Sequence, residues 1–563
     1  MTKRRFYTKL YKMPILSLLI FIPVIASLLM AFSPEQFVPY FRWVTLIITG
    51  IELLLCIYLY YNFNTQVSDY QFLEKFDWIT LPLGNLGVGS IDYLLGVDGI
   101  SMPMVLLTGI VMFVGAISSF EITDRKRGYH TLYLLLAGSI IGCFLALDMF
   151  LFYLFFEFML LPMYFLIGLW GGLRREYASI KFFLYTLVGS IFILIVMIGL
   201  YLSVIDPVET AVQMGLINSS KDVTPQIISQ IQSLLAEGEL PSQQIVHTFD
   251  LRFMPDQGNY ISDSWLNIFS ANKVGEISLR SLSFIFLMVG FGIKLPVVPF
   301  HTWLPDAHVE APTPVSVVLA GILLKIGGYG FLRITYPIFP EIANQYAIWI
   351  VGFGVLSIIY GAFNALAMND LKKMIAYSSV SHMGFVLLGI GSLTSEGFNG
   401  AVYQMFSHGI LSSMLFLLVG VLYSRTHDRR IDSYQGLASK LPLFTLMTAI
   451  AFFASLGLPA FSGFIGEIFT LMGAFNSPLI PRWLAGLATF GLVLGAGYFL
   501  WTLQRMFFGK FWIRQYEETL QDLTLREKTM LYPLSILALI FGIFPHIIFD
   551  VTNLSLAELI KLF

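Results

Sequence analysis

Long apolar stretches constrain the fold of this chain more than any other feature. About fourteen of them approach the ~20 residues that a helix needs to cross a bilayer. Hydrophobic residues make up 57% of the 563 positions and charged residues only 12%. Open sheets cannot lie in lipid, because their backbone polar groups stay unpaired there. The sequence therefore predicts an all-α polytopic membrane protein. We expect spans at 14–32, 41–62, 99–120, 130–147, 149–170, 177–204, 279–300, 314–336, 344–367, 373–393, 397–423, 443–474, 485–508 and 530–550.

Two of these spans are predicted to be broken helices. In the seventh, Lys294 is followed by Pro296 and Pro299, and a proline inside a helix frees carbonyls that only protein or internal water can satisfy. The twelfth, 443–474, is too long for one straight crossing and contains Gly457-Leu458-Pro459. Spans four to eight and nine to thirteen would each form a five-helix unit. Because an odd number inverts topology, we expect two inverted repeats with ion sites at the breaks.

Two more polar regions interrupt the apolar pattern. One alternates polar and apolar residues around glycine turns, which is typical of a surface hairpin, and the other is the one long polar insertion. The expected organisation is 1–129 for three N-terminal spans with the hairpin at 68–97, 130–336 for the first repeat with the insertion at 205–275, 337–510 for the second repeat, and 511–563 for a linker and the last span.

Lysine and arginine in short loops predict the orientation. Under this span count, the basic loops all fall on one side, which we interpret as the cytoplasm, so that both termini face outward. The N-terminal segment MTKRRFYTKLYK dissents with five basic residues. Either translation begins at Met13, or the later loops outweigh this segment. The loops that carry the signal are Asp124 to Arg127, Arg174-Arg175, Lys372-Lys373, Arg425 to Arg430 and Arg505 to Arg514.

Ionisable residues inside apolar spans are the candidate functional residues. A charge at the bilayer centre costs about 2.5–3.5 kcal/mol on insertion scales, so such residues mark ion pathways more often than scaffolding. Glu157 lies in the fifth span among phenylalanines, and Lys294 is its natural partner. A buried lysine can load and release a proton as its surroundings change. The alternative is an ion pair that only fixes helix register.

Four further residues extend this pattern. Lys325 lies midway along the eighth span, where the alternative is an amine that reaches back to the interface. His382 and His408 are suited to relaying protons, or else are hydrogen-bonded core residues. Glu467 follows the break in the twelfth span and mirrors Lys294 with opposite sign.

Other polar residues near the spans are more ambiguous. Asp98 and Asp148 lie at span ends, where a capping role and a functional role are equally well supported. The link between spans seven and eight is expected to be a hydrated turn near a proton entrance, with a metal site as the alternative. It contains His301, Asp306, His308 and Glu310.

Composition argues against several other classes of protein. The net charge of −2 gives no basic field for nucleic acid. Two isolated thiols, Cys56 and Cys143, cannot ligate an iron–sulfur cluster or a structural zinc. The glycines between Gly84 and Gly89 lie between short strand-like runs, which indicates a hairpin turn rather than a nucleotide loop. We therefore expect neither a redox cofactor nor a metal on this chain.

Four long motifs resemble the antiporter-like subunits of complex I, the proton-pumping NADH:quinone oxidoreductase, and in particular the chain-4 type, called subunit M in bacteria. The resemblance covers almost all of residues 70–515, whereas the N-terminus and the insertion are less similar to the family. The motifs are LFFEFMLLPMYFLIGLWG, KLPVVPFHTWLPDAHVEAPTPVSVVLAGILLKIGGYGFLR, DLKKMIAYSSVSHMGFVLLGI and GLPAFSGFIGE.

This resemblance implies a function and a set of partners. NADH, FMN, iron–sulfur clusters and quinone would be bound by other subunits, and this chain would contact neighbouring antiporter-like subunits in a bacterial inner membrane. Two alternatives remain: a subunit of a multi-subunit cation/proton antiporter, and a membrane scaffold whose ion pairs are structural. The resemblance implies a proton path through Glu157, Lys294, Lys325, His382, His408 and Glu467.

Overall fold

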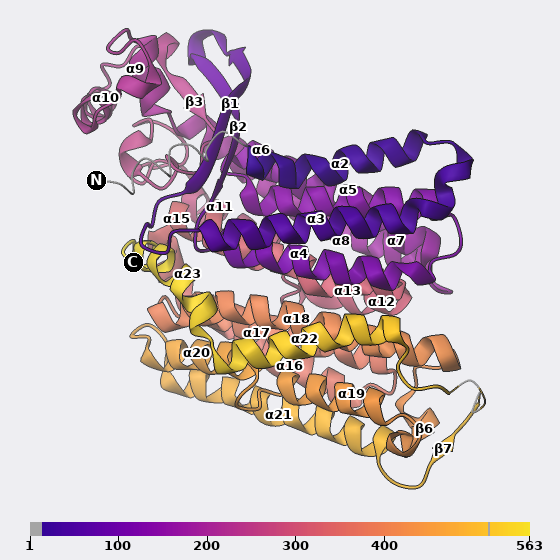
Figure 1. The fold of residues 1–563 in the computed structure, drawn as a ribbon. Helices are drawn as coiled ribbons and strands as arrows, with labels where there is room; N and C mark the ends of the chain where they lie inside the picture. The colour runs from indigo at the N-terminus through magenta and orange to yellow at the C-terminus, as the bar shows by residue number, and fades with distance from the viewer. Residues whose placement is uncertain (1–13, 516–517, 519) are drawn as a thin grey trace, which may run out of the picture.

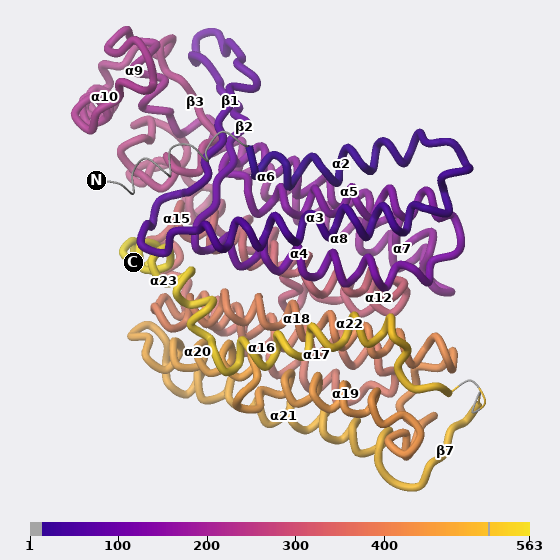
Figure 2. The backbone as a smooth tube through the Cα atoms, viewed as in Figure 1, coloured from indigo at the N-terminus to yellow at the C-terminus, as the bar shows by residue number. Residues whose placement is uncertain are grey.

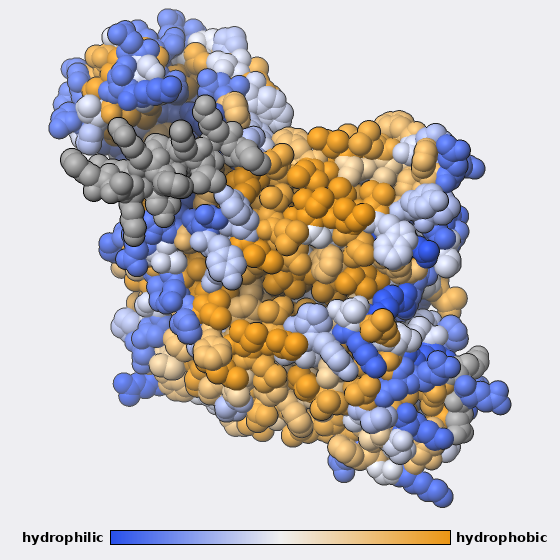
Figure 3. Space-filling model, in the orientation of Figure 1, coloured by the Kyte–Doolittle hydropathy of each residue, from blue (hydrophilic) through white to orange (hydrophobic). Residues whose placement is uncertain are grey.

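A bundle of long helices with a small lobe at one end makes up the molecule (Figure 1). The computed structural model describes residues 14–515, 518 and 520–563, so the basic N-terminal segment and the alternative start at Met13 lie outside the described residues. The tube view shows the indigo N-terminal helices in the upper part of the bundle and the yellow C-terminal helices across its middle (Figure 2). Apolar residues cover the flank of the bundle that faces the viewer, while polar residues gather at its two ends and on the lobe (Figure 3).

Eleven helices in the described part of the chain are long and apolar enough to cross a membrane, and a bent helix pair makes a possible twelfth. Three of the predicted spans, 279–300, 443–474 and 530–550, do not form single straight helices. The prediction of one straight span at 530–550 is wrong, because two helices meet there at 63° next to Pro545. A proline disfavours helical backbone at the residue that precedes it. The two helices are α22 (Leu525–Ile543) and α23 (His546–Ile560).

The other spanning helices follow the apolar stretches closely. They are α2 (Ile15–Phe32), α3 (Phe41–Asn62), α4 (Ser101–Ser118), α5 (Lys126–Leu145), α6 (Met149–Phe158) with α7 (Leu160–Trp170), α8 (Arg175–Ser203), α16 (Pro340–Ala367), α17 (Leu371–Gly391), α18 (Ser395–Thr426) and α21 (Arg482–Phe507). Apolar side chains at these positions face lipid or pack against neighbouring helices, so helical hydrogen bonding satisfies the backbone in either setting.

Both helices that were predicted to break do so. The chain leaves α11 (Leu279–Lys294) at the lysine and resumes in α12 (Trp303–Glu310). It leaves α19 (Pro442–Ser455) and resumes in α20 (Ser462–Asn476). Gly457 adopts a left-handed φ of 78° in the second break, a conformation that glycine takes without steric cost.

The eighth span is helical throughout but irregular. Two wide π-helical turns, η8 (Leu319–Leu323) and η9 (Phe331–Thr335), alternate with α13 (Thr313–Val318), α14 (Leu324–Gly330) and α15 (Tyr336–Ile338). Such turns are frequent at functional sites. One of them directly precedes the turn that carries Lys325.

The hairpin region and the insertion join in one lobe. Strands β1 (Gln71–Pro82) and β2 (Val88–Val97) pair antiparallel, and β3 (Val246–Thr248) of the insertion adds parallel to β2. Figure 1 shows this sheet beside the two helices of the insertion, beyond the bundle end. The remaining elements are α9 (Pro207–Gln213), α10 (Pro225–Glu237), β4 (Lys273–Val274) and β5 (Ile277–Ser278), with β6 (Tyr434–Gln435) and β7 (Trp512–Ile513) at the opposite end.

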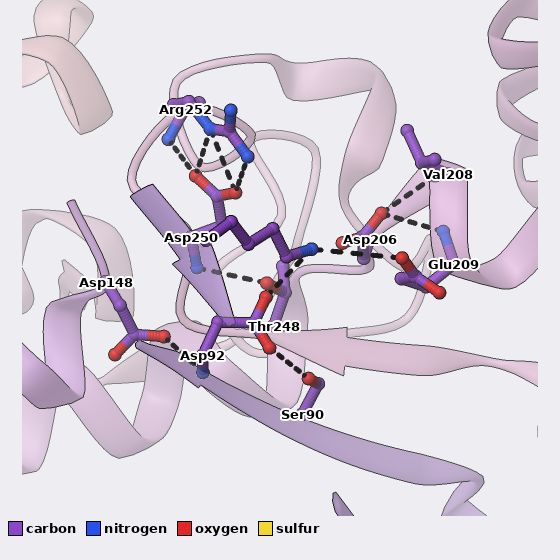
Figure 4. A network of polar contacts seen from close by, with 10 residues as sticks. Ser90, Asp92, Asp148, Asp206, Val208, Glu209, Thr248, Asp250 and Arg252 are labelled. Atoms are coloured by element: carbon purple, nitrogen blue, oxygen red, sulfur yellow. Dashed lines mark hydrogen bonds and ion pairs between the residues drawn. The ribbon is translucent and has the colours of Figure 1, made fainter. Parts of the chain in front are cut away.

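Buried aspartates connect the elements of the lobe through hydrogen bonds and ion pairs (Figure 4). Asp148 caps α6 by accepting the Leu151 N–H at 2.9 Å, and it also accepts the Asp92 N–H from β2 at 3.1 Å. Asp206 caps α9, and Asp250 pairs with Arg252. Asp148 therefore has a capping role that links the sheet to the helix bearing Glu157.

The lobe is expected to lose stability as pH rises toward neutrality. Burial raises the pKa of Asp206 to about 7, against about 3.9 when unfolded. The folded lobe then holds a proton that the unfolded chain releases, so its stability falls between about pH 4 and pH 7. Asp206→Asn keeps an oxygen that accepts the α9 N–H groups and removes this titration. The hydrogen-exchange rates of the α9 amides, corrected for intrinsic rates, should differ less between pH 5 and pH 8 in the variant than in the native protein. An equal difference in both proteins would show that Asp206 does not cause the pH dependence.

The basic loops lie at the end of the bundle opposite the lobe. Arg429 contacts Asp370 at 3.5 Å and donates to the Val309 carbonyl at 2.6 Å, while Lys372 donates to the Ala311 carbonyl at 2.6 Å. These contacts bring loops from three different parts of the chain together. The basic loops thus pack against one another at the end of the bundle that lacks the lobe.

Candidate functional site

Lys325 and His408 form the centre of a buried polar chain. Lys325 is 0% exposed, its Nζ lies 2.7 Å from His408 Nδ1, and it also donates to the Ala320 carbonyl. The π-helical turn η8 places that carbonyl where the amine can reach it. The amine therefore points to protein partners and does not reach back to an interface.

His382 and Glu467 continue the chain from the same region. His382 Nδ1 lies 3.1 Å from Glu467 Oε1, and the rings of His382 and His408 have their centroids 5.4 Å apart. Glu467 Oε2 points at the break between α19 and α20, because a Cβ added at Gly457 would lie 2.3 Å from it. The broken helix thus makes room for the carboxylate.

A small cavity of about 10 Å³ lies among these side chains, enough for about one water molecule. Sequence reasoning missed part of its lining. Gln404, one turn before His408 on α18, lies 3.5 Å from His382 Nδ1, and Ser407 donates to Ser462 at 2.8 Å. The i, i+4 spacing of Gln404 and His408 is a signal that could have found the glutamine.

Glu157 and Lys294 lie near each other but are not joined. Among the described residues no ion pair links them, and Glu157 Oε1 and Lys294 Nζ are buried without a hydrogen-bond partner. The ammonium instead lies 4.7 Å from the centroid of the Phe156 ring, a cation–π contact. Glu157 and Lys294 are therefore neighbours without a direct ion pair, and the lysine packs against the adjacent phenylalanine.

Apolar packing separates Lys294 from Lys325. Gly327 fits tightly against the end of α11, since a Cβ there would lie 2.6 Å from the Leu295 nitrogen and 2.7 Å from the Phe291 carbonyl oxygen. This glycine brings the two helices into close contact. The six candidate residues accordingly form two groups: Glu157 with Lys294, and Lys325, His408, His382 and Glu467 together.

The polar link between spans seven and eight is dispersed. Asp306 binds Lys181 at 2.7 Å, and Glu310 accepts the Arg174 N–H at 3.0 Å. His308 stacks on Phe416 with ring centroids 4.4 Å apart. In the described parts of the chain, no three histidine, cysteine or acidic side chains are grouped to hold a metal. Asp98, the other uncertain residue, pairs with Arg333 inside the protein.

The connected group has the chemistry of a proton conductor. An amine and an imidazole can exchange a proton across a 2.7 Å contact, and each imidazole can donate on one nitrogen while accepting on the other. A carboxylate at the end of the chain can accept the proton. Hydrogen bonds in a low-dielectric interior are strong, so each added or removed charge alters its neighbours.

Comparison with known proteins places this architecture. The family model for the transmembrane part of NADH:quinone oxidoreductase and Mrp antiporters matches residues 146–219 and 260–494. NADH-quinone oxidoreductase subunit M of Rickettsia felis is 37% identical over 560 residues, covering 98% of this chain and all of that protein. A chain of respiratory complex I from Thermus thermophilus, solved with bound NADH, superposes with a TM-score of 0.74 at 29% identity, covering 98% of this chain and 99% of that one.

An antiporter complex shares the fold as well. A chain of the Mrp complex from Dietzia superposes with a TM-score of 0.73 at 19% identity, over 97% of both chains. At 19% identity this similarity concerns the fold alone, whereas the relative at 37% identity is an NADH-quinone oxidoreductase subunit. The chain therefore belongs to the NADH:quinone oxidoreductase/Mrp antiporter transmembrane family.

Proposed function

We propose that this chain is a proton-translocating membrane subunit of an NADH:quinone oxidoreductase and conducts protons through Glu157, Lys294, Lys325, His408, His382 and Glu467. Redox chemistry would take place on partner subunits that carry FMN, iron–sulfur clusters and the NADH and quinone sites. This chain would bind none of these groups. Its partners would include neighbouring antiporter-like subunits and the surrounding lipid of a bacterial inner membrane.

The observation that carries the proposal is the buried series of ionisable side chains from Lys325 to Glu467, in which two close contacts are joined by neighbouring histidine rings. Four ionisable side chains from α14, α17, α18 and α20 converge there, although each costs free energy to place inside a membrane. A structural ion pair needs only two partners, whereas this series contains four side chains that can each load and release a proton. Apolar packing separates Lys325 from Lys294, and a change of conformation would open and close this gap to protons.

We also infer how the chain crosses the membrane. About fourteen crossings would result if each broken helix counts as one span. Spans four to eight (130–336) and nine to thirteen (337–510) would be inverted repeats, with 1–129 and 511–563 flanking them. The basic loops lie at one end of the bundle and the lobe at the other. This arrangement supports an orientation in which the basic end is cytoplasmic and both termini face outward.

The energetics are within reach of such a mechanism. Moving one proton outward opposes about 2.3 kcal/mol per 100 mV of membrane potential. A change of two pKa units at one buried group corresponds to about 2.7 kcal/mol. A few coupled changes of this size, driven in sequence by neighbouring charges, would suffice for one transported proton.

Replacing Lys294 with alanine tests the proposal in the native membrane. We expect the complex to assemble while NADH:quinone turnover and proton pumping both fall by about tenfold or more, because positioned proton-transfer groups contribute at least that much. Assembly, turnover and pumping are measured on the same membranes. Unchanged NADH oxidation with lost cation/proton exchange would favour the antiporter alternative. No change in any of the three would place Lys294 outside the pathway and favour a scaffold.

A further inference from the structure

A buried carboxylate lies outside the proton path described above. Glu52 is midway along α3 and 0% exposed. Both of its carboxylate oxygens are buried and have no hydrogen-bond partner among the described residues. An isolated ionised carboxylate is far too costly in such surroundings, so the group is expected to carry a proton. An unpaired acid deep in a membrane span indicates function before structure.

Few charged or titratable groups face Glu52. The helices packed most closely on α3 are α2, α4 and α5, and α2 and α4 contain no charged residue. On α5, Tyr133 lies close enough for an electrostatic interaction, but its hydroxyl donates to the Met112 carbonyl at 2.8 Å. On α3 itself, Cys56 is the neighbouring group. A lone carboxylate with these neighbours lacks the several oxygen ligands that a metal cation needs, so its ligand is a proton.

One face of α3 carries polar side chains between this acid and one end of the helix. Thr45, Thr49 and Glu52 follow each other at helical spacing, and all three are fully buried. His130 of α5 is also buried and lies 3.1 Å from the Thr45 hydroxyl through Nδ1. His130 in turn lies close to Lys126 and Arg42, at the bundle end that carries the basic loops.

The opposite direction along α3 is closed. Beyond Glu52 the same face continues with Cys56 and Leu59, both 0% exposed. Gly109 of α4 packs tightly there, because an added Cβ would lie 3.1 Å from the Cys56 sulfur. Thr49, Thr45 and His130 thus lead from Glu52 toward one end only.

We propose that Glu52 is an exchangeable proton-binding site, reached from the basic-loop end along Thr49, Thr45 and His130 and separate from the chain between Lys325 and Glu467. The proposal does not depend on the redox function proposed above, since it concerns only α3, α4 and α5. Glu52 would bind and release a proton without passing it across the membrane, because its route opens at one end.

Infrared difference spectroscopy of the membrane complex, purified through a tag on this chain, tests the proposal. The spectrum should contain the carbonyl band of a protonated carboxylic acid that shifts in D₂O, and Glu52→Gln should remove it. Glu52→Asp should move the band without removing it, which keeps the test decisive if the glutamine variant fails to assemble. An Asp variant spectrum identical to that of the native protein, or a band that never shifts in D₂O, would overturn the proposal.

The route is tested by the rate of the same deuterium shift. His130→Gln keeps a hydrogen-bonding group near Thr45 but cannot relay protons near neutral pH, so exchange at Glu52 should slow by roughly 100-fold. Tyr60→Phe is the matched control: it removes a hydroxyl that donates to the Ile547 carbonyl from the other half of α3, and should leave the rate unchanged. Equal rates in the native protein and both variants would overturn the proposed route.

Discussion

Replacing Lys325 with methionine is expected to abolish proton translocation while the complex still assembles. Methionine fills a similar apolar volume, but it removes the amine that contacts His408 at 2.7 Å and the Ala320 carbonyl. The chain toward Glu467 then loses its proton donor on the Lys294 side. A fall of about 100-fold or more in pumping rate is expected, in line with the loss of a positioned acid–base group. Proton uptake by inverted membrane vesicles measures this rate directly.

Lys561→Met is the matched control for this experiment. Lys561 is an exposed lysine paired with Glu558 at 2.7 Å near the C-terminus, and its loss should leave pumping within twofold of the native rate. Assembly is compared for both variants by the amount of complex in the membrane. Pumping retained in an assembled Lys325→Met complex would exclude this lysine from the proton path.

Replacing Asp98 with alanine is expected to cause a large loss of folding stability. Asp98 pairs with Arg333, whose guanidinium also donates to the hydroxyls of Tyr70 at 2.8 Å and Tyr329 at 3.0 Å. The ion pair is almost fully buried, and removing one partner leaves an uncompensated charge at a cost of about 3–5 kcal/mol. The apparent thermal midpoint of the solubilised complex should fall, and less complex should accumulate in the membrane.

A double variant separates the unpaired charge from other effects of the substitution. Asp98→Ala combined with Arg333→Met removes both charges, so part of the lost stability should return. Asp428→Ala provides a comparison at the surface, where Asp428 binds the half-exposed Arg430 at 2.8 Å and exposed pairs contribute only about 0–1 kcal/mol. A double variant less stable than Asp98→Ala would show that Arg333 contributes mainly through its tyrosine contacts.

The fold could be predicted from sequence where local chemistry decides it. Apolar length located the helices, and the prolines after Lys294 and the Gly457-Leu458-Pro459 segment located the breaks in α11 and α19, because both residue types act on their own backbone. The parallel pairing of β2 with β3 could not be foreseen, since it joins segments 158 residues apart. The bend next to Pro545 was missed because hydropathy carries no information on helix direction.

The candidate site shows the same division. The type and position of the six candidate residues were evident in the sequence, since an ionisable residue stands out in an apolar run, but Glu52 in α3 was missed. The pairing of the six was not evident: Glu467 contacts His382 across two helices, and Lys294 contacts Phe156 in place of Glu157. These partners depend on helix rotation and on side-chain rotamers, which periodicity alone does not define.

The apolar parts of the helices that carry Lys325 and His408 are buried inside the protein. The most apolar windows of Thr313–Ile338 and Ser395–Thr426 are both 100% buried inside the protein, whereas those of α3, α8 and α21 are 28% to 39% buried. The outer helices would therefore insulate the proposed proton path electrically from the lipid. A proton on that path would be surrounded by protein and not by lipid, so we expect its transfer rate to depend little on the lipid composition of the membrane.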